Sequence, residues 1–354
     1  GHLLQAMVGL GHEVVASAPD RLQYVSDALK EIEVTYEQVF FQRTGTDPLA
    51  DVKAVFDFWR FFSEVRPDIV LLYTIKPVIY GSLAAKFAGV PDIFSMITGA
   101  GYVFGDCSPK QRYIRIAIEP LYRQALEYNK KVFFQNPDDR DLFLRRRLIS
   151  DPEQCVLING SGVDIDYFEK TPVSRDKISF LLVARLIGEK GIYEYAEAAR
   201  RLKQLYPEVT FRLLGPFDSN PTSIHPAKIE QWQSEGIIEY LGETRDVRPY
   251  MAQCSVFVLP SYREGTPRTV LEAMAIGRAI VTTDAPGCRE TVVEGINGYL
   301  VPVRDVDSLA RALERFIKDP ELIQQMGKES RRIAVEKYDV RKVNRVILET
   351  MDLC

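Results

Sequence analysis

The sequence predicts an α/β protein built from two doubly wound domains, and three observations support this fold class. Short apolar runs typical of buried strands alternate with amphipathic helical stretches along the chain. This alternation occurs in two series, separated at residues 160–177 by a stretch with the glycine, proline and charge of a linker. The 354 residues are enough for two domains of about 150–170 residues each.

The first series contains five strand-like runs. They are HEVVASAP (12–19), PDIVLLYT (67–74), VPDIFSMI (90–97), KVFFQN (131–136) and QCVLING (154–160). Helices are expected at RLQYVSDALKE and near GSLAAKFAG. The chain itself begins in a predicted helix, GHLLQAMVGLGHEV, whereas a doubly wound domain normally opens with a strand and a tight loop. We therefore expect the first strand of this domain to be missing from the sequence, through truncation or disorder.

The second series begins after residue 175 and shows the same rhythm. Strands are predicted at KISFLLVARL (177–186), VTFRLLG (209–215), IIEYLGE (237–243), CSVFVLPS (254–261) and RAIVTTD (278–284). Helices are expected through YEYAEAARRLKQL and TVLEAMAI. These patterns place the two domains at residues 1–165 and 166–335, and a last helix at 336–354 is expected to pack back on the first domain.

Composition and charge argue against several classes of protein. The net charge of −4 and the pI of about 5.7 are unlike those of a nucleic-acid-binding protein, which usually has a basic face. The five cysteines form no CxxC pair and are interpreted as reduced thiols of a cytoplasmic protein. The three histidines lack metal-ligand spacing, which argues against a zinc enzyme or a Ser-His-Asp hydrolase. No apolar run reaches the ~18–20 residues that a membrane helix needs.

The segment REGTPRTVLEAMAIGRAIVTTDAPG (263–287) predicts an anion site at a helix start. Thr266 is a good N-cap residue, Pro267 fits the first helical position, and Gly277 ends the helix. The backbone N–H groups expected to point outward unpaired are those of Arg268, Thr269 and Val270. Together with the helix dipole they suit a diphosphate, and the turn follows a strand, where ligands bind in open α/β sheets.

Two carboxylates flank this helix start. Glu272 lies five residues past Pro267, about 7–8 Å along the helix axis, and Glu264 lies before the helix. A nucleoside-diphosphate sugar has a matching shape, so Glu272 could accept hydrogen bonds from ribose hydroxyls while Glu264 holds the sugar. Gly265 would let the backbone approach closely. The alternatives are that Glu272 is an exposed helix residue and that Glu264 only caps the helix or pairs with Arg263.

A second turn supplies the cations that a diphosphate needs. In VARLIGEKG, at a strand end, Arg185 can clamp two phosphate oxygens and Lys190 supplies a point charge. Gly215, which ends the strand VTFRLLG, is a weaker candidate for contact with the base. The alternative is that Arg185 and Lys190 form a solvated turn. Neither turn is specific alone, but both follow strands of one domain.

At these residues the second half resembles the family 4 retaining glycosyltransferases, which have the GT-B architecture of two facing Rossmann-like domains. Three segments carry the resemblance: the two glutamates with seven residues between them in E-GTPRTVL-E, the turn ARLIGEKG, and NGSGVDIDYF, which is similar to the family's crossover segment. The resemblance implies that Glu264, Arg185 and Lys190 act in catalysis. It implies donor-binding roles for Glu272, Gly265, Thr266, Arg268, Thr269, Val270, Leu271 and Gly215.

The first half is similar to bacterial family members that extend polyprenyl-diphosphate-linked sugars for O-antigen, capsule or protein glycans, including those that act on undecaprenyl-diphospho-bacillosamine. YTIKPVIYGSLAAKFAGVP and MITGAGYVF carry this similarity. Many relatives have a histidine near the first segment, where this chain has Thr74, Ile75 and Lys76. Lys76 could substitute for it, or it could be a solvated or core-edge lysine.

The resemblance also implies substrates and a mechanism. The donor would be a UDP-sugar, with GDP as the open alternative, and the first domain would hold an acceptor sugar linked to a lipid diphosphate. Transfer would retain the donor's α-configuration by a same-face displacement, in which the leaving phosphate takes the acceptor proton. Arg185, Lys190 and the helix amides would stabilise the departing diphosphate. No Asp-x-Asp metal motif is needed, so we expect no metal and no other cofactor.

Some segments have two interpretations each. QRYIRIAIEPLYRQALEYNKK (111–131), together with the arginines at 145–147, is predicted to lie on an anionic membrane surface, or else is a packed helix with a solvated face. The stretch 98–101 could be a cleft wall or a plain loop. Asp284, Arg289 and Glu290 could line the sugar pocket or form a surface pair.

Two alternative functions stay open. A nucleotide-sugar 2-epimerase shares the architecture, although its chemistry needs acid/base groups and this chain is poor in histidine. A non-catalytic nucleotide-sugar-binding subunit is the alternative outside the enzymes.

Overall fold

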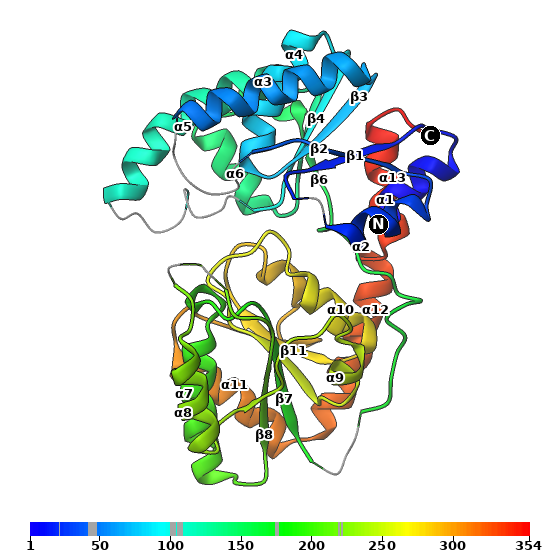
Figure 1. Ribbon diagram of the computed structural model, residues 1–354. Helices are drawn as coiled ribbons and strands as arrows, with labels where there is room; N and C mark the ends of the chain where they lie inside the picture. The colour runs from blue at the N-terminus through cyan, green and yellow to red at the C-terminus, as the bar shows by residue number, and fades with distance from the viewer. Residues whose placement is uncertain are drawn as a thin grey trace. The chain divides into compact units, whose positions relative to one another are not determined.

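The structure is a computed structural model that describes residues 1–20, 22–41, 48–99, 104, 109–173, 177–218, 220 and 222–354. The chain divides into two compact α/β units with parallel sheets (Figure 1). The first unit comprises Gly1–Ile158 together with Val343–Cys354, and the second comprises Asn159–Lys342. The fold class predicted from the alternating strand and helix patterns is thus confirmed.

The second unit contains one parallel sheet of six strands in the order β12-β11-β10-β7-β8-β9. The strands are β7 (Ser179–Val183), β8 (Thr210–Leu214), β9 (Glu239–Tyr240), β10 (Val256–Leu259), β11 (Ala279–Thr283) and β12 (Gly298–Val301). Every residue of β7, β10 and β11 is buried, as expected for central strands of a parallel sheet covered on both faces. The sequence patterns predict the first five of these strands and miss β12.

The strand order creates a reversal between β7 and β10. From β7 the chain builds β8 and β9 on one side and then returns to place β10, β11 and β12 on the other. Crevices at such a reversal, beyond the carboxyl ends of the strands, are where open α/β sheets bind ligands. The chain places the turn after β7 and the loop after β10 at this point.

Helices cover this sheet on both faces (Figure 1). Helix α7 packs against α11, while α10 packs against α9 and α12. The helical segments are η4 (Gly188–Lys190), α7 (Ile192–Leu205), α8 (Pro226–Ser234), α9 (Arg248–Ala252), α10 (Arg268–Ile276), η5 (Arg289–Thr291), α11 (Val306–Lys318) and α12 (Glu321–Lys337).

The first unit contains a parallel sheet of four strands in sequence order and a separate parallel pair. The sheet is formed by β3 (Ile69–Tyr73), β4 (Asp92–Ile97), β5 (Lys131–Phe134) and β6 (Cys155–Leu157), and the pair by β1 (Val15–Ala18) and β2 (Thr35–Gln38). The sequence analysis predicts all of these except β2. That strand, TYEQ, alternates exposed and half-buried residues and therefore lacks an apolar run.

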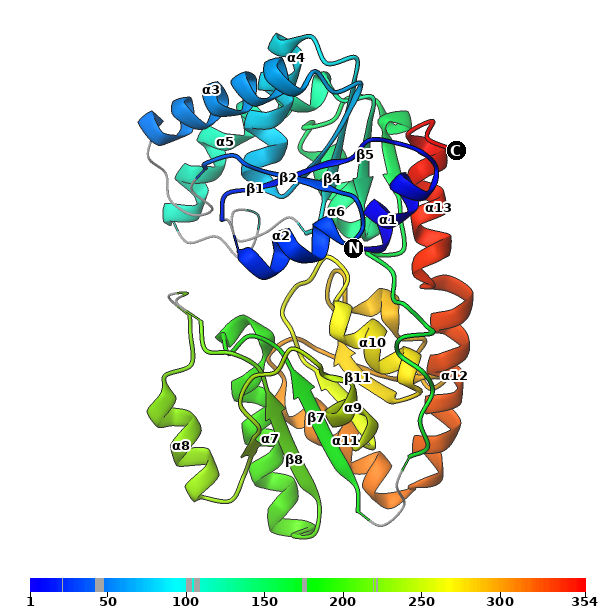
Figure 2. The same cartoon turned by 45° about the vertical axis from the view of Figure 1, so that its right-hand side comes forward.

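Two helical layers cover opposite faces of the four-stranded sheet, because successive strand side chains point to opposite faces (Figure 2). Val70, Leu72 and Ile93 pack against one layer, and Phe94 and Met96 pack against the other. The first layer comprises α3 (Pro48–Val65), the π-helical turn η1 (Pro77–Gly81), α4 (Ser82–Ala88), α5 (Pro109–Glu127) and α6 (Pro137–Arg145). The second comprises α1 (His2–Gly9) and most of α13 (Val340–Thr350). The remaining segments are α2 (Gln23–Lys30) and η3 (Pro152–Gln154). No helix in the described residue ranges is long and apolar enough to cross a membrane.

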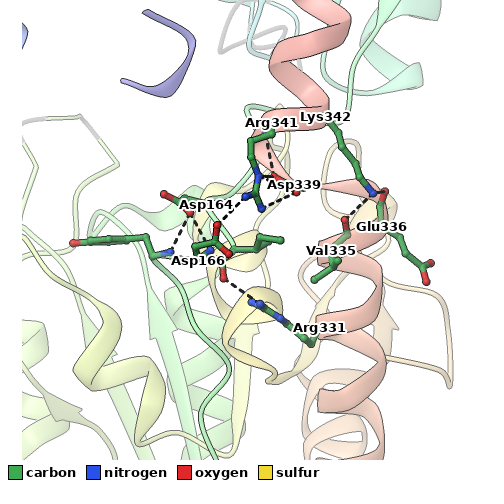
Figure 3. Close-up of polar contacts among 10 residues, drawn as sticks. Asp164, Asp166, Arg331, Val335, Glu336, Asp339, Arg341 and Lys342 are labelled. Atoms are coloured by element: carbon green, nitrogen blue, oxygen red, sulfur yellow. Dashed lines mark hydrogen bonds and ion pairs between the residues drawn. The ribbon is translucent and has the colours of Figure 1, made fainter. Parts of the chain in front are cut away.

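The crossover segment, which contains GVD at residues 162–164, lies against the end of α12 within the second unit (Figure 3). Arg341 donates to both carboxylate oxygens of Asp339 and pairs with Asp166 at 2.8 Å. Arg331 donates to the backbone carbonyl of Ile165 at 3.1 Å and to that of Phe168 at 2.9 Å. These bonds attach the crossover segment, where the chain enters the second unit, to α12 and the start of α13, where the chain leaves it.

Candidate active site

The candidate site lies where β7 and β10, two neighbouring parallel strands, end. Residues 184–191, which we call the β7 turn, lead into α7, and residues 260–267, the β10 loop, lead into α10. Both segments leave the carboxyl edge of the sheet at its topological reversal. The two motifs predicted from the sequence therefore share one edge of one sheet.

Lys190 of the β7 turn and Glu264 of the β10 loop form an ion pair. The ammonium donates to Oε1 of the carboxylate, and the Ser261 hydroxyl donates to the same oxygen at 2.7 Å. Both charged side chains are largely buried, so the pair is less screened by solvent than a surface pair would be. The structure thus brings together two of the three residues to which the resemblance assigns catalysis.

The backbones of the β7 turn and the β10 loop are in direct contact. The Tyr262 amide donates to the carbonyl of Glu189 at 2.9 Å. Gly191 has φ of +72°, and a Cβ there would lie 2.1 Å from the carbonyl oxygen of Pro260. Only glycine fits this position, because a side chain would be strained and would push the segments apart. Gly191 therefore keeps Lys190 within reach of Glu264.

Helix α10 begins one residue later than predicted. Its N-cap residue is Pro267, not Thr266, and its first helical residue is Arg268. The Val270 amide is not free as predicted, because the Pro267 carbonyl accepts its hydrogen bond at 3.0 Å, and the Leu271 amide reaches the same oxygen at 3.3 Å. Within the described ranges, the Arg268 and Thr269 amides have no hydrogen-bond acceptor. The free donors at this helix start are these two.

Glu272 lies one turn into α10 and is buried. Arg268 Nε donates to its Oε1 at 3.0 Å. Burial raises the pKa of the Glu272 carboxyl, and the neighbouring guanidinium lowers it in part. Oε2 accepts no hydrogen bond from any described residue. A ligand that donates hydrogen bonds to this carboxylate would relieve the cost of burying its charge.

Arg185 lies in the same turn as Lys190 but has a different partner. Its Nη1 pairs with Oδ2 of Asp218 at 2.7 Å, and the side chain is 58% exposed. The Asn220 amide and then Arg185 lower the pKa of Asp218, which is therefore charged at neutral pH. Gly215 closes the end of β8, where φ is +149° and a Cβ would lie 1.8 Å from the carbonyl oxygen of Ala184. Close packing of strand ends thus accounts for this glycine.

Gly265 and Thr266 of the β10 loop are in close contact with two glycines from other segments, Gly287 and Gly160. A Cβ on Gly287 would lie 2.3 Å from the carbonyl oxygens of both Glu264 and Gly265. A Cβ on Gly160 would lie 2.8 Å from Cβ of Thr266. The loop that carries Glu264 is therefore held from several sides before any ligand binds.

The other candidates have local partners. Lys76 pairs with Asp51 at 2.7 Å within the first unit, so its charge is compensated there. Arg289 pairs with Asp284 at 2.7 Å. Residues 100 and 101 of the predicted cleft wall lie outside the described residues. In the described part of the chain, no group of three or more His, Cys, Asp and Glu side chains could hold a metal ion.

Sequence reasoning missed Ser261 and the aromatic residue beside it. The Tyr262 hydroxyl donates to Oε1 of Glu194 at 2.7 Å, and the Arg304 guanidinium lies 4.6 Å from the ring centroid. Burial and the hydrogen bond to Glu194 raise the pKa of Tyr262 to about 12. Glu194 is 68 residues away along the chain. No local sequence spacing could have indicated this contact.

Comparisons with known proteins cover both units. Residues 1–160 match the family described as glycosyl transferase 4-like domain, and residues 164–333 match glycosyl transferases group 1. The chain is 28% identical to the Campylobacter jejuni N,N'-diacetylbacillosaminyl-diphospho-undecaprenol alpha-1,3-N-acetylgalactosaminyltransferase, over 90% of this chain and 85% of that protein. It is 24% identical to the Escherichia coli UDP-Gal:alpha-D-GlcNAc-diphosphoundecaprenol alpha-1,3-galactosyltransferase, over 83% and 77% of the two chains.

Solved structures show the same fold. Anabaena HepE in complex with UDP superposes with a TM-score of 0.78 at 19% identity, over 100% of this chain and 96% of that chain. The sucrose-phosphate synthase of Thermosynechococcus elongatus gives 0.75 at 18% identity, over 97% and 96%. Since family matches cover nearly the whole chain and the solved structures share the GT-B fold, this chain belongs to the group 1, family 4-like glycosyltransferases.

Proposed function

We propose that the chain is a retaining glycosyltransferase that moves a hexose or N-acetylhexosamine from a UDP-sugar to a saccharide linked to a polyprenyl diphosphate. The names of two relatives support this acceptor, since both act on undecaprenyl-diphosphate-linked sugars. A neighbouring structure with UDP-glucose supports the donor class. The observation that carries the proposal is the cluster of Lys190, Glu264 and Ser261 beside the start of α10, at the reversal of the sheet.

The donor would lie along the start of α10. Glu272 would accept hydrogen bonds from the ribose hydroxyls through its Oε2, and the amides of Arg268 and Thr269 would donate to the diphosphate. The guanidinium of Arg185 is exposed and can reorient towards phosphate, although it would have to leave Asp218 or share it. Glu264, fixed by Lys190 and Ser261, would accept a hydrogen bond from a hydroxyl of the transferred sugar.

Catalysis of the chemical step would be mainly electrostatic. The bond between the anomeric carbon and the diphosphate oxygen breaks while the acceptor oxygen bonds to that carbon on the same face. The acceptor proton passes to the leaving phosphate oxygen, so the charge balances and the α-configuration is kept. Lys190, Arg185 and the free helix amides would stabilise the negative charge that grows on the diphosphate, in geometry already set before the reaction.

We propose that this reaction needs no divalent metal. The cations of the β7 turn and the α10 amides would take over the neutralisation of the diphosphate that a metal supplies in other transferases. Transfer is therefore expected to persist in EDTA. Activity that disappears with EDTA and returns only with Mg²⁺ or Mn²⁺ would contradict this expectation.

The test is a transfer assay with UDP- and GDP-sugars and with polyprenyl-diphosphate-linked mono- and disaccharides. We expect UDP-dependent transfer and an α-linked product, read from the anomeric proton coupling by NMR. Glu264→Ala should lower kcat by about a hundredfold or more. Glu230→Ala removes an exposed glutamate of α8 in the same unit and is the matched control. Unchanged turnover of Glu264→Ala, or conversion of the donor to its epimer without acceptor, would overturn the proposal.

A further inference from the structure

The loop after β8 lies alongside the β7 turn and is joined to it by backbone hydrogen bonds. We call the described residues of this loop the β8 loop: 215–218, 220 and 222–225. The Leu186 amide donates to the Pro216 carbonyl at 2.9 Å, and the Gly188 amide donates to the Thr222 carbonyl at 2.8 Å. In the opposite direction, the Ile224 amide donates to the Leu186 carbonyl at 2.8 Å. The β8 loop is therefore attached at both of its ends to the turn that carries the candidate cations.

Asp218 has a fixed place in the β8 loop. Its Oδ1 accepts a hydrogen bond from the Asn220 amide at 2.8 Å, which closes an Asx turn. The Asn220 side chain in turn accepts from the amide and from the hydroxyl of Thr222, both at 2.9 Å. The Asp218 side chain is only 17% exposed. The local backbone therefore sets the position of this carboxylate, independently of the arginine with which it pairs.

Arg185, the partner of Asp218, is held by one contact only. Its Nη1 donates to Oδ2 of Asp218 at 2.7 Å, and no other residue in the described part of the chain accepts a hydrogen bond from it. The side chain is 58% exposed. The opposite edge of the guanidinium, formed by Nε and Nη2, presents two parallel N–H donors, the arrangement that binds two oxygens of a phosphate. A fixed carboxylate thus holds a solvent-exposed guanidinium by one nitrogen and leaves this edge open.

We propose that Asp218 is a positioning residue for the donor diphosphate, because it orders Arg185 through Nη1 while the Nε–Nη2 edge binds phosphate. The inference rests on the proposed function and deepens it at the diphosphate. An exposed ion pair contributes little energy by itself, so the benefit lies in orientation. Ordering a long side chain before the ligand arrives lowers the entropy cost of binding. The opposite role, in which Asp218 competes with the diphosphate for Arg185, would require both anions to use the same donor, yet four of the five donors stay open.

Calorimetric titration of the purified chain with UDP, GDP, uridine and inorganic pyrophosphate measures this effect. Asp218→Asn keeps the shape of the side chain but leaves one oxygen to serve both the Asn220 amide and the guanidinium. We expect binding of UDP and of pyrophosphate to weaken about three- to tenfold, because the guanidinium must then be ordered on binding. Binding of uridine, which has no phosphate, should not change. Glu239→Gln, the matched control, removes a carboxylate that pairs with Arg212 at 3.0 Å and should bind UDP like wild type.

The decisive comparison repeats the substitution without the guanidinium. Arg185→Ala alone should weaken UDP binding, and Asp218→Asn added to it should change the affinity by less than about twofold, because the aspartate acts only through the arginine. An equal loss in both backgrounds would overturn the inference, since Asp218 would then act through the structure of the β8 loop. Unchanged or tighter UDP binding by Asp218→Asn would overturn it too, the tighter binding in favour of competition for Arg185.

The choice of ligands separates this inference from the proposed function. UDP binding that Asp218→Asn does not alter would contradict the positioning role alone. Binding of GDP or pyrophosphate but not of UDP, with the expected loss in Asp218→Asn, would contradict the proposed UDP-sugar donor and support the positioning role. Absence of binding for every phosphate ligand would overturn both.

Discussion

Replacing Glu272 by glutamine tests the donor site through two opposite effects. The substitution keeps the shape of the side chain and removes a buried negative charge. If ribose hydroxyls donate to this carboxylate, the loss of a charged acceptor costs about 1.5–3 kcal/mol. That corresponds to UDP binding roughly 10- to 150-fold weaker.

Glu272→Gln should weaken UDP binding without lowering the stability of the unliganded protein. Burial raises the Glu272 pKa above its ordinary value of 4.5, so the folded chain holds this proton more tightly than the unfolded chain. Its contribution is therefore favourable below pH 4.5 and is lost as the pH rises through the higher folded pKa. At pH 7 the charged form is the unfavourable one, and glutamine avoids it. The ion pair with the exposed Arg268 offsets little of this cost.

The assay combines calorimetric titration of UDP at pH 7 with thermal unfolding at pH 7 and pH 4.5. We expect weaker UDP binding, a melting temperature at pH 7 equal to or above that of wild type, and a smaller difference at pH 4.5. Glu230→Gln, on the exposed face of α8, serves as control. UDP affinity within twofold of wild type would refute the ribose role. A melting temperature several degrees lower would show that Glu272 is mainly structural.

Three further variants test the scaffold of the site. Ser261→Ala removes the hydroxyl that donates to Glu264, so kcat should fall about tenfold while the melting temperature changes little, and an unchanged kcat would argue against positioning. Gly191→Ala places a Cβ 2.1 Å from the Pro260 carbonyl oxygen, so urea unfolding should show a loss of about 1–3 kcal/mol, and full stability would contradict the packing argument. Arg278→Met leaves unpaired the buried backbone carbonyls to which this arginine donates, and should cost about 3 kcal/mol or more; a smaller loss in the same urea experiment would mean that these carbonyls find other partners.

The parts of the fold that the sequence predicted are those with strong local patterns. Buried strands such as FLLV in β7 are apolar throughout, because both faces of the sheet are covered. The polar β2 has no such run, and β12 has only the three apolar residues after Gly298, so the sequence analysis missed both strands. Helix α3 was missed for the opposite reason. It carries apolar residues on its exposed and on its buried side, and this hides the helical period.

The candidate site also has features that local motifs predict and features that only the fold determines. The motifs are local in sequence, and they placed Lys190 in the turn after β7, Glu264 in the loop after β10 and Glu272 in the helix that follows, as the structure has them. The contact between Lys190 and Glu264 spans 74 residues and depends on the neighbourhood of β7 and β10. The start of α10 at Arg268 depends on the extended conformation of Pro267, whose ψ is 110°. The sequence does not reveal this conformation, because Thr266 just before it is a good N-cap residue.

The placement of α13 has a consequence for how the polypeptide is made. Val343, Ile347 and Met351 are buried in the same cluster as Met7 and Phe94, although they leave the ribosome more than 200 residues later. N-terminal domains usually fold first during synthesis. Here the first unit stays open on one sheet face until translation has passed the whole second unit. The nascent chain therefore exposes that apolar face until α13 has emerged and covers it.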